Sequence, residues 1–248
     1  MKVTLLDVDN SDLCYQTTEN EYIHKMYTAA RTCYSADTID ELYHNDPTSV
    51  EDEWKLVQKV LASGHQSIAE HVIFTFGIDQ VSRSLTHQLV RHRLCTFSQQ
   101  SQRYTNFSDK CFHYVTPPSI EQNESLNKEY DLIMEQLKNF YDRAVNAGIK
   151  PEDARFVLPN AATTNITVST NLRNLMHIMN LRLCNRAQWE IRAVFVEMKK
   201  QIKMYFPKLS TLLVPSCEIY GFCLEGQCCG KKPSKKQMQE ALNNYKPE

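Results

Sequence analysis

Two kinds of apolar spacing occur along the chain and predict interspersed strands and helices. Alternating or β-branched stretches predict strands, whereas apolar residues three or four positions apart predict helices. The predicted strands are 2–8, 71–78 and 165–170. The predicted helices are 20–33, 81–91, 171–184 and 187–205, with a short polar helix at 234–244. This order favours an α+β fold, a mixed α/β single domain with a central sheet flanked by long helices.

End signals predict two more helices. Pro47 suits the first position of a helix that Gly64 would end. Ser119 and Gln122 have the spacing of a capping box, so we expect the longest helix to begin there and to run to about Ala147. The apolar stripe of that helix is Leu126, Tyr130, Ile133, Leu137, Tyr141 and Ala144.

The composition is that of an ordinary soluble globular protein. The 248 residues carry a net charge of −1, with 42% hydrophobic and 23% charged residues. No apolar run approaches the ~20 residues of a membrane helix. The N-terminus lacks a signal-peptide pattern, so we expect a cytoplasmic protein without membrane contact. Cysteine, glycine and lysine become frequent after Pro215, which predicts a domain at 1–215 and a Cys/Lys-rich C-terminal extension at 216–248.

The nine cysteines form no pattern of paired ligands. Their odd number and scattered positions favour reduced thiols over a disulfide framework. The extension contains Cys217, Cys223, Cys228 and Cys229. Because their spacing lacks the usual CxxC pairs of a zinc site, we predict no metal and favour free thiols over a tail metal site or a disulfide. The six glycines form no phosphate-binding loop, so side chains must hold much of any bound nucleotide.

A basic segment at 91–104, with the sequence RHRLCTFSQQSQRY, stands out in this balanced chain. It combines arginines with hydroxyl, amide and aromatic side chains, which suits an anion such as a phosphate. Surface arginines more often pair with nearby acids, but no acid occurs between Asp79 and Asp109. The alternative is an RNA-binding surface with Phe97 and Tyr104 as stacking residues, and the small net charge counts against it.

Side-chain alternation would sort the polar residues of this segment. If the stretch is extended, Gln99, Ser101 and Arg103 share one face, which suits a nucleotide phosphate and a polar base. Arg91 and Arg93 would likewise share a face if their own stretch is extended.

Four motifs occur in the order found in one known family. Arg91-His92-Arg93 is followed, after seven residues, by Ser101. The other three motifs are GHQSIAEH at 64–71, ARFVLP at 154–159 and NLRLCNRAQWEIR at 180–192. Together these motifs resemble those of the flavin-dependent thymidylate synthases and cover residues 64–192.

The resemblance implies the reductive methylation of dUMP to dTMP, a step of nucleotide biosynthesis. Methylenetetrahydrofolate would supply the carbon, FAD would carry the hydride, and NADPH or NADH would reduce the flavin. It also implies the fold of that family, with residues 1–215 as the catalytic domain. The expected assembly is a homotetramer with active sites at the subunit interfaces, and no nucleic-acid partner is expected.

The same resemblance implies roles for individual residues. Those expected to bind dUMP are Gln88, Arg91, Gln99, Gln100, Ser101, Arg103, Arg155 (from another subunit) and Arg182. Those expected to bind FAD are His65, Ser67, Glu70, Arg91, His92, Arg93, Gln99, Asn171, Arg173 and His177. Arg182 is the expected catalytic residue, because a cation beside the pyrimidine would stabilise negative charge on N3 or O2 and activate C5. Gln99 departs from the family, in which many members have Glu.

Two of these residues also have simpler interpretations. His177 shares a helix face with Arg173, but a lone histidine there is usually a partly buried residue with its hydrogen bonds satisfied. Arg155 would equally suit a salt bridge at a helix end, to Glu152 or Asp153.

Overall fold

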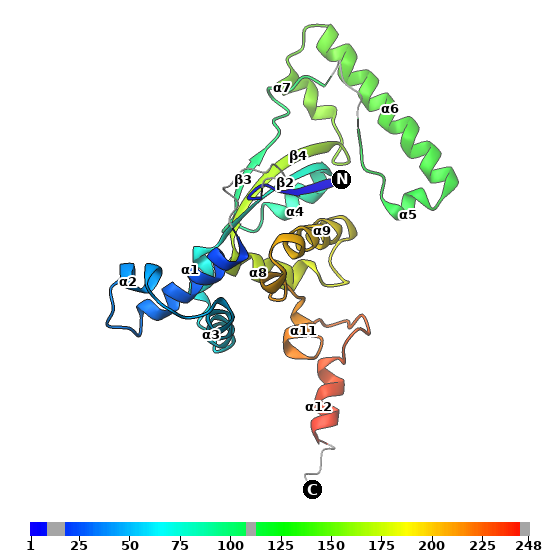
Figure 1. Cartoon of the computed structure of the whole chain (residues 1–248). Helices are drawn as coiled ribbons and strands as arrows, with labels where there is room; N and C mark the ends of the chain where they lie inside the picture. The colour runs from blue at the N-terminus through cyan, green and yellow to red at the C-terminus, as the bar shows by residue number, and fades with distance from the viewer. Residues whose placement is uncertain (9–17, 108–112, 244–248) are drawn as a thin grey trace. The chain divides into compact units, whose positions relative to one another are not determined.

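The computed structural model describes residues 1–8, 18–107 and 113–243. Packing divides the chain into two compact units. The first unit comprises 1–2 with 77–168, and the second comprises 3–76 with 169–248. Figure 1 shows the helices and strands of both units along the chain.

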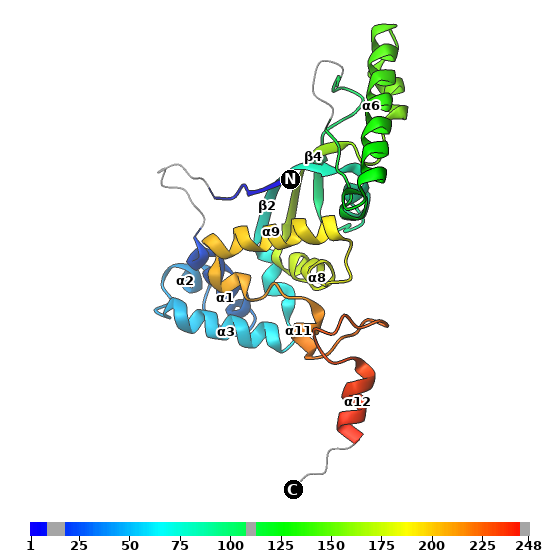
Figure 2. The same ribbon diagram turned by 90° about the vertical axis from the view of Figure 1, so that its right-hand side faces the viewer.

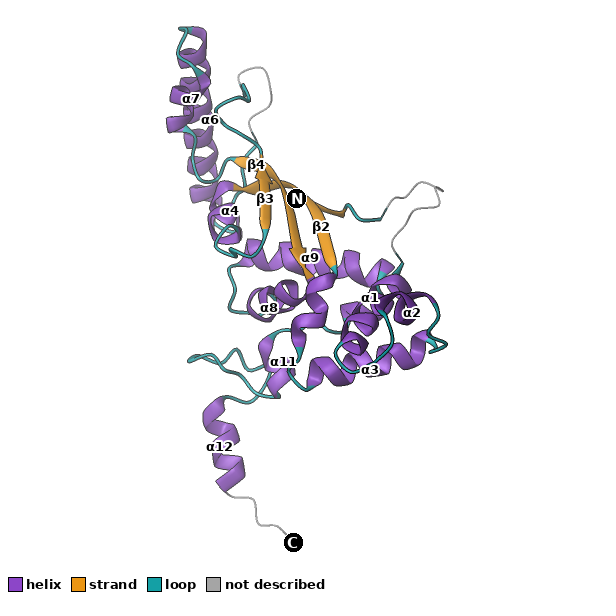
Figure 3. Ribbon diagram, turned by 90° about the vertical axis from the view of Figure 1, so that its left-hand side faces the viewer, coloured by secondary structure: helices purple, strands orange, loops and turns teal. Residues whose placement is uncertain are grey.

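The strands of the described residues form one antiparallel sheet. They are β1 (Lys2–Leu5), β2 (Ile73–Ser82), β3 (Thr96–Gln99) and β4 (Thr163–Asn171), in the order β1-β2-β4-β3 (Figure 3). β1 is an edge strand, and it is shorter than the strand predicted at 2–8, because the chain turns after Leu5. Alternate residues of β4 are buried, which confirms the strand predicted from its β-branched sequence. The strand expected at 71–78 lies slightly later, because residues 66–71 form a short helix instead.

The second unit is largely helical. Its helices are α1 (Glu19–Thr32), α2 (Ile39–His44), α3 (Val50–Ala62), the 3-10 helix η1 (Gln66–His71), α8 (Leu172–Arg182), α9 (Trp189–Tyr205), α10 (Pro207–Ser210), α11 (Ser216–Tyr220) and α12 (Lys235–Asn243). Figure 2 shows α1, α2 and α3 packed side by side. The Tyr22 ring stacks on Phe206 at 5.3 Å and meets the edge of Phe74 at 5.4 Å, so three distant segments share one aromatic core.

The first unit contains the longest helix. Its helices are α4 (Arg83–Leu89), α5 (Pro118–Glu121), α6 (Glu124–Asn146), α7 (Pro151–Ala154) and the 3-10 helix η2 (Arg155–Val157). Met134 and Tyr141 are the buried residues of α6. Leu126 and Ile133, both in its apolar stripe, are 50% and 43% exposed. These two residues of the stripe therefore do not face a core of this chain.

The two helices expected from end signals form, with corrected starts. α3 begins three residues later than the Pro47 signal indicated, because the Ser49 hydroxyl accepts a hydrogen bond from the backbone N–H of Asp52 at 3.2 Å. Gly64 follows the end of α3 with a φ of +92°, a conformation that glycine adopts without strain, as predicted.

The capping box expected at Ser119 and Gln122 is wrong. A short helix, α5, ends at Glu121, and Asn123 caps α6 by accepting a hydrogen bond from the N–H of Leu126 at 3.2 Å. The acceptor that satisfies the first free N–H groups of the long helix decides where it begins. Gly148, with a φ of +88°, follows the end of α6 as expected.

The α+β class predicted from the sequence is confirmed. None of the helices in the described ranges is long and apolar enough to cross a membrane.

Candidate functional site

The basic segment of the first unit begins where α4 ends. Burial of Leu85 and Leu89 fixes the inner face of α4. The N–H of Arg91 then donates to the carbonyl of Gln88 at 3.3 Å, and that of His92 donates to Leu89 at 3.1 Å. Residues 90–95 therefore form a turn and are not extended. The shared face that an extended stretch would give to Arg91 and Arg93 does not form. The turn leaves Arg91 and Arg93 exposed and His92 half-buried.

Gln99, at the end of β3, is directed toward α4 and β4. Its side-chain amide donates to the hydroxyl of Thr86 at 3.0 Å and to that of Thr164 at 3.4 Å. The next residue, Gln100, donates its backbone N–H to the carbonyl of Asn165 at 2.9 Å. These bonds use the donor end of the Gln99 carboxamide, so its oxygen is the atom left to serve a ligand.

The alternation expected through residue 103 is wrong, because the chain turns at 102–104. The N–H of Arg103 donates to the hydroxyl of Ser101 at 3.1 Å, which brings these two polar residues together by a turn rather than by a shared strand face. The Arg103 guanidinium also lies over the ring of Tyr104, 5.3 Å from its centroid.

Glu152 links two of the expected dUMP residues. Its carboxylate accepts from Arg103 Nη2 at 3.2 Å, and its backbone carbonyl accepts from Arg155 Nε at 3.1 Å. Arg155 thus bonds the carbonyl of Glu152 rather than forming the salt bridge to its carboxylate that was the simpler interpretation. Arg103, in contrast, does pair with an acid, one that is distant in the sequence.

Arg83 is a functional candidate that the motifs did not identify. Burial lowers the pKa of its guanidinium, and the nearby charge of Arg155 lowers it further. Arg83, Arg103 and Arg155 therefore form a group of three cations with one carboxylate, Glu152. We call these four residues the arginine group. No sequence signal relates Arg83 to Arg155, because their proximity depends on how the loop before β4 folds back: the N–H of Arg83 donates to the carbonyl of Ala162 at 3.0 Å.

In the second unit, η1 packs against the start of α8. This contact brings Glu70 and Arg173, both expected at FAD, into an ion pair. Asn171 is the N-cap of α8, and its side-chain oxygen accepts from the N–H of Asn174 at 2.9 Å. Asn171 therefore has a structural role whether or not it also contacts a ligand.

A cavity of about 630 Å³ lies beside η1, between the ends of α1 and α3. Two expected FAD residues line it, His65 and Ser67. The remaining polar residues that line this cavity were not expected from the sequence. They are Arg31, Cys33, Tyr34, Lys59, Ser63 and His71. This volume is within the range of ~300–1,000 Å³ that ligand pockets occupy.

His177 and Arg182 lie farther along α8. The side chain of His177 is exposed, so its interpretation as a partly buried histidine is wrong. Arg182 is half-buried in the last turn, and burial lowers the pKa of its guanidinium. A partly desolvated cation interacts more strongly with a nearby developing anion than a fully hydrated one does.

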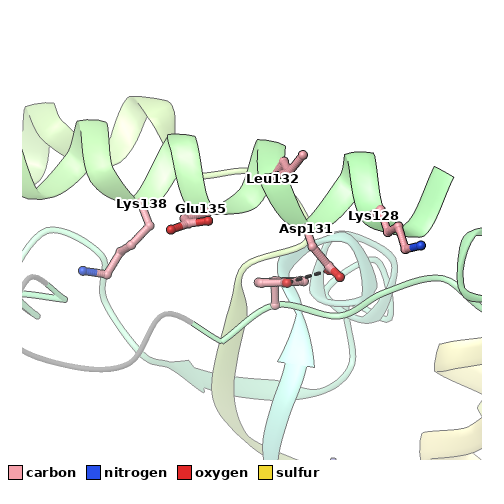
Figure 4. A pocket seen from close by; sticks show the side chains of 6 residues that line it. Lys128, Asp131, Leu132, Glu135 and Lys138 are labelled. Atoms are coloured by element: carbon pink, nitrogen blue, oxygen red, sulfur yellow. Dashed lines mark hydrogen bonds between the residues drawn. The ribbon is translucent and has the colours of Figure 1, made fainter. Parts of the chain in front are cut away.

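The first unit has another concave surface, along α6, of about 690 Å³. Figure 4 shows Asp131, Glu135 and Lys138 projecting from the same side of the helix. Asp131 accepts a hydrogen bond from the Tyr114 hydroxyl at 2.7 Å, and this bond raises the pKa of Tyr114 to about 12. None of the expected dUMP or FAD residues lines this surface.

The fold and these side chains define an α+β protein with clustered cations in each unit, which is a surface suited to phosphorylated ligands. Comparison with known proteins then identifies the family. The family model described as "Thymidylate synthase complementing protein" matches residues 14–208. Flavin-dependent thymidylate synthases from Geobacter sulfurreducens and Nitratidesulfovibrio vulgaris are similar to the chain, with 44% identity over 211 residues and 40% over 232 residues.

These alignments cover 85% and 88% of this chain, and 90% and 94% of the two relatives. A flavin-dependent thymidylate synthase from Pyrococcus furiosus is 39% identical over 82% of the chain and 85% of its own length. The chain therefore belongs to the family of flavin-dependent thymidylate synthases, as its motifs predicted.

Proposed function

We propose that this enzyme methylates dUMP to dTMP with methylenetetrahydrofolate as carbon donor, FAD as hydride carrier and NADPH as reductant, in the cytoplasm. The family assignment supports dTMP synthesis with a flavin. The arginine group is the observation that carries the proposal, because an excess of cations beside a serine hydroxyl suits a nucleotide monophosphate.

In this proposal the first unit binds dUMP through Gln88, Arg91, Gln99, Gln100, Ser101 and Arg103, and Arg155 of another subunit completes the site. The dUMP phosphate would compete with the Glu152 carboxylate for Arg103, since both are anions and the pair is half-exposed. Gln99 would accept a hydrogen bond through its oxygen, because its donor end is bound to Thr86 and Thr164. The loss of charge relative to Glu would then alter this contact without removing it.

FAD is assigned to His65, Ser67, Glu70, Asn171, Arg173 and His177, with Arg91, His92, Arg93 and Gln99. The residues of the second unit fit such a ligand, because hydroxyl, imidazole and cationic groups line or adjoin a cavity of adequate size. Arg173 stands in the first turn of α8, where backbone N–H groups also favour an anion. FAD that has been reduced by NADPH would supply a hydride, which no side chain can supply.

Arg182 is the catalytic residue of the proposal. Its half-buried guanidinium would lie against the uracil ring and stabilise negative charge on N3 or O2, which raises the electron density at C5. Because the last turn of α8 fixes the backbone position of Arg182, the cation would need little reorganisation as charge develops.

We also propose a homotetramer with active sites between subunits, in which Arg155 reaches the dUMP of a neighbour. The apolar residues that α6 leaves exposed support the assembly, since a second copy would cover them; they are Leu126, Leu132, Ile133 and Phe140. Mass measurement of the purified protein in solution tests this directly, and a monomer at micromolar concentration would contradict it.

The function is tested by a single turnover. The enzyme is reduced with NADPH and mixed, without oxygen, with dUMP and methylenetetrahydrofolate, and flavin absorbance and dTMP are followed together. We expect flavin oxidation with an equal amount of dTMP. Flavin that remains reduced, with no dTMP formed, would refute the proposed reaction.

Arg182→Ala tests the catalytic assignment. We expect FAD to remain bound and the rate of dTMP formation to fall by roughly 10²–10³-fold, the usual effect of removing one group that stabilises charge in a transition state. Arg186→Ala is the matched control, because it removes the same charge from the exposed turn after α8. A normal rate with Arg182→Ala would show that another residue activates the uracil.

A further inference from the structure

Cysteines from three separate segments surround one small cavity of the second unit. The cavity has a volume of about 190 Å³, and its lining includes Cys184, Cys217, Cys223 and Cys229. Cys184 follows α8, Cys217 belongs to α11, and the other two lie in the loop after α11. We call these four residues the cysteine pocket. All of this loop lies beyond residue 208, where the match to the family model ends.

The extension has almost no hydrophobic core. Of its described residues from Ser216 onward, Cys223 is the one that is buried, at 5% exposure. Nevertheless its backbone follows a defined path. Gly221 and Gly230 have φ values of +74° and +83°, and the backbone of Cys223 forms an isolated β-bridge with that of Ser234. A segment this short that buries so little apolar surface usually needs a metal or a cross-link to hold such a path.

Cationic side chains and an N–H donor lie around the cysteine pocket, together with the Glu218 carboxylate. Lys231 and Lys232 line the cavity, and both pair with Glu218, at 3.0 and 3.3 Å. Cys229 Sγ accepts from the side-chain amide of Asn185 at 3.7 Å. N–H donors and lysine charges stabilise sulfur in its anionic form.

We propose that the cysteine pocket binds one Zn²⁺ through the thiolates of Cys184, Cys217, Cys223 and Cys229. Four thiolates prefer tetrahedral Zn²⁺ among the common divalent ions. Each Zn–S bond forms as one thiol loses its proton, so Zn²⁺ and four thiols give a site of charge −2 and four released protons. The two lysines offset that charge.

The neighbouring Cys228 is left out of the ligand set because it does not line the cavity. Its sulfur lies 3.0 Å from the carbonyl oxygen of Lys232, to which the thiol donates. A thiolate there would meet the carbonyl oxygen without a proton between them, which is repulsive. Cys228 therefore gives a matched control one residue away from Cys229.

Binding requires movement of side chains. Among the described residues, no three ligand groups already meet at coordinating geometry. Burial raises the pKa of Cys217, which favours the protonated thiol before metal arrives. Metal binding would therefore bring the four sulfurs together and would fasten the extension to the end of α8. Arg182 ends α8, two positions before Cys184. This proximity bears on catalysis only if the proposed function holds.

The test measures metal and does not depend on activity. Full-length protein is purified under reducing conditions, and its zinc content is determined by elemental analysis. The protein is then stripped with a chelator and titrated with Zn²⁺ and, separately, with Co²⁺. We expect one zinc per chain and, with Co²⁺, the intense long-wavelength absorption of tetrahedral thiolate coordination, beyond the flavin bands.

Single variants test the assignment of ligands. We expect Cys217→Ser and Cys229→Ser to lose most of the bound zinc, whereas Cys228→Ser and the distant Cys33→Ser retain it. If a serine variant fails to fold, Co²⁺ spectra of the wild-type chain still decide the question. Absence of zinc, iron in its place, equal zinc in all four variants, or a disulfide among these cysteines under reducing conditions would each overturn the proposal. Normal dTMP formation without zinc would leave the proposed function intact.

Discussion

Removal of the Arg173 side chain should weaken FAD binding with little effect on folding. Arg173 and Glu70 form an ion pair in which the side chains are 50% and 45% exposed. Pairs this exposed contribute ~0.2–1 kcal/mol to stability. Arg173 is also a cation in the first turn of α8, where the helix dipole makes a positive charge unfavourable by ~0.3–1 kcal/mol. The two contributions nearly cancel for Arg173→Ala.

The expected effect on the ligand is larger. A guanidinium bonded to a phosphate contributes about 1.5–3 kcal/mol, which corresponds to a roughly 10- to 150-fold rise in the Kd for FAD. We therefore expect Arg173→Ala to change the free energy of unfolding by less than about 0.5 kcal/mol, because the ion-pair and helix-dipole contributions nearly cancel. Unfolding in urea must be measured without FAD, because a bound ligand would itself stabilise the folded state.

Lys208→Ala is the matched control. It removes another surface pair of the second unit, between Lys208 and Glu51 at 2.6 Å, with side chains 33% and 63% exposed. FAD affinity, measured by quenching of flavin fluorescence on binding, should not change in this control. The reasoning fails if Arg173→Ala binds FAD as tightly as wild type does, or if it unfolds at much lower urea concentration.

Two further predictions follow from polar contacts. Arg103→Ala should raise the Kd for dUMP by roughly 10-fold or more. Glu152→Gln removes the competing carboxylate and should lower that Kd. Calorimetric titration measures both values, and unchanged affinity in both variants would exclude Arg103 from the dUMP site. His24 should make stability decrease with pH: burial alone would lower its pKa, but hydrogen bonds to Glu53 at 2.7 Å and to the carbonyl of Tyr43 at 2.8 Å raise it overall. Its contribution to stability is therefore present below the unfolded pKa of about 6.5 and is lost as pH rises through the higher folded pKa. Urea unfolding from pH 6 to 8 should therefore show a smaller loss of stability in His24→Gln than in wild type. An identical pH dependence of the two proteins would contradict this account.

Local signals in the sequence were enough for several parts of this protein. Regular apolar spacing predicted β1, β4 and the helices α8 and α9, because each pattern repeats with the period of the element itself. Gly64 and Gly148 marked helix ends, since glycine adopts a positive φ without strain. The four collinear motifs predicted the family, because they depend on residue identity and order rather than on the path of the chain.

Contacts between distant residues were decided by the tertiary structure. No acid occurs in the sequence between Asp79 and Asp109, yet folding brings Glu152 to Arg103 and Arg83 close to Arg155. Gln99 points inward because Thr86 and Thr164 accept its amide protons, which no alternation rule indicates.

The cysteines show the same division most clearly. Their spacing in the sequence argued against a metal, because Cys217, Cys223 and Cys229 lack the CxxC pairs of common zinc sites. The fold adds Cys184 from the end of α8 and places it at the same cavity. Spacing reports only on ligands that are close in sequence, whereas a coordination site depends on distances in space. Sequence therefore determined the elements and the family, and tertiary packing determined which side chains act together.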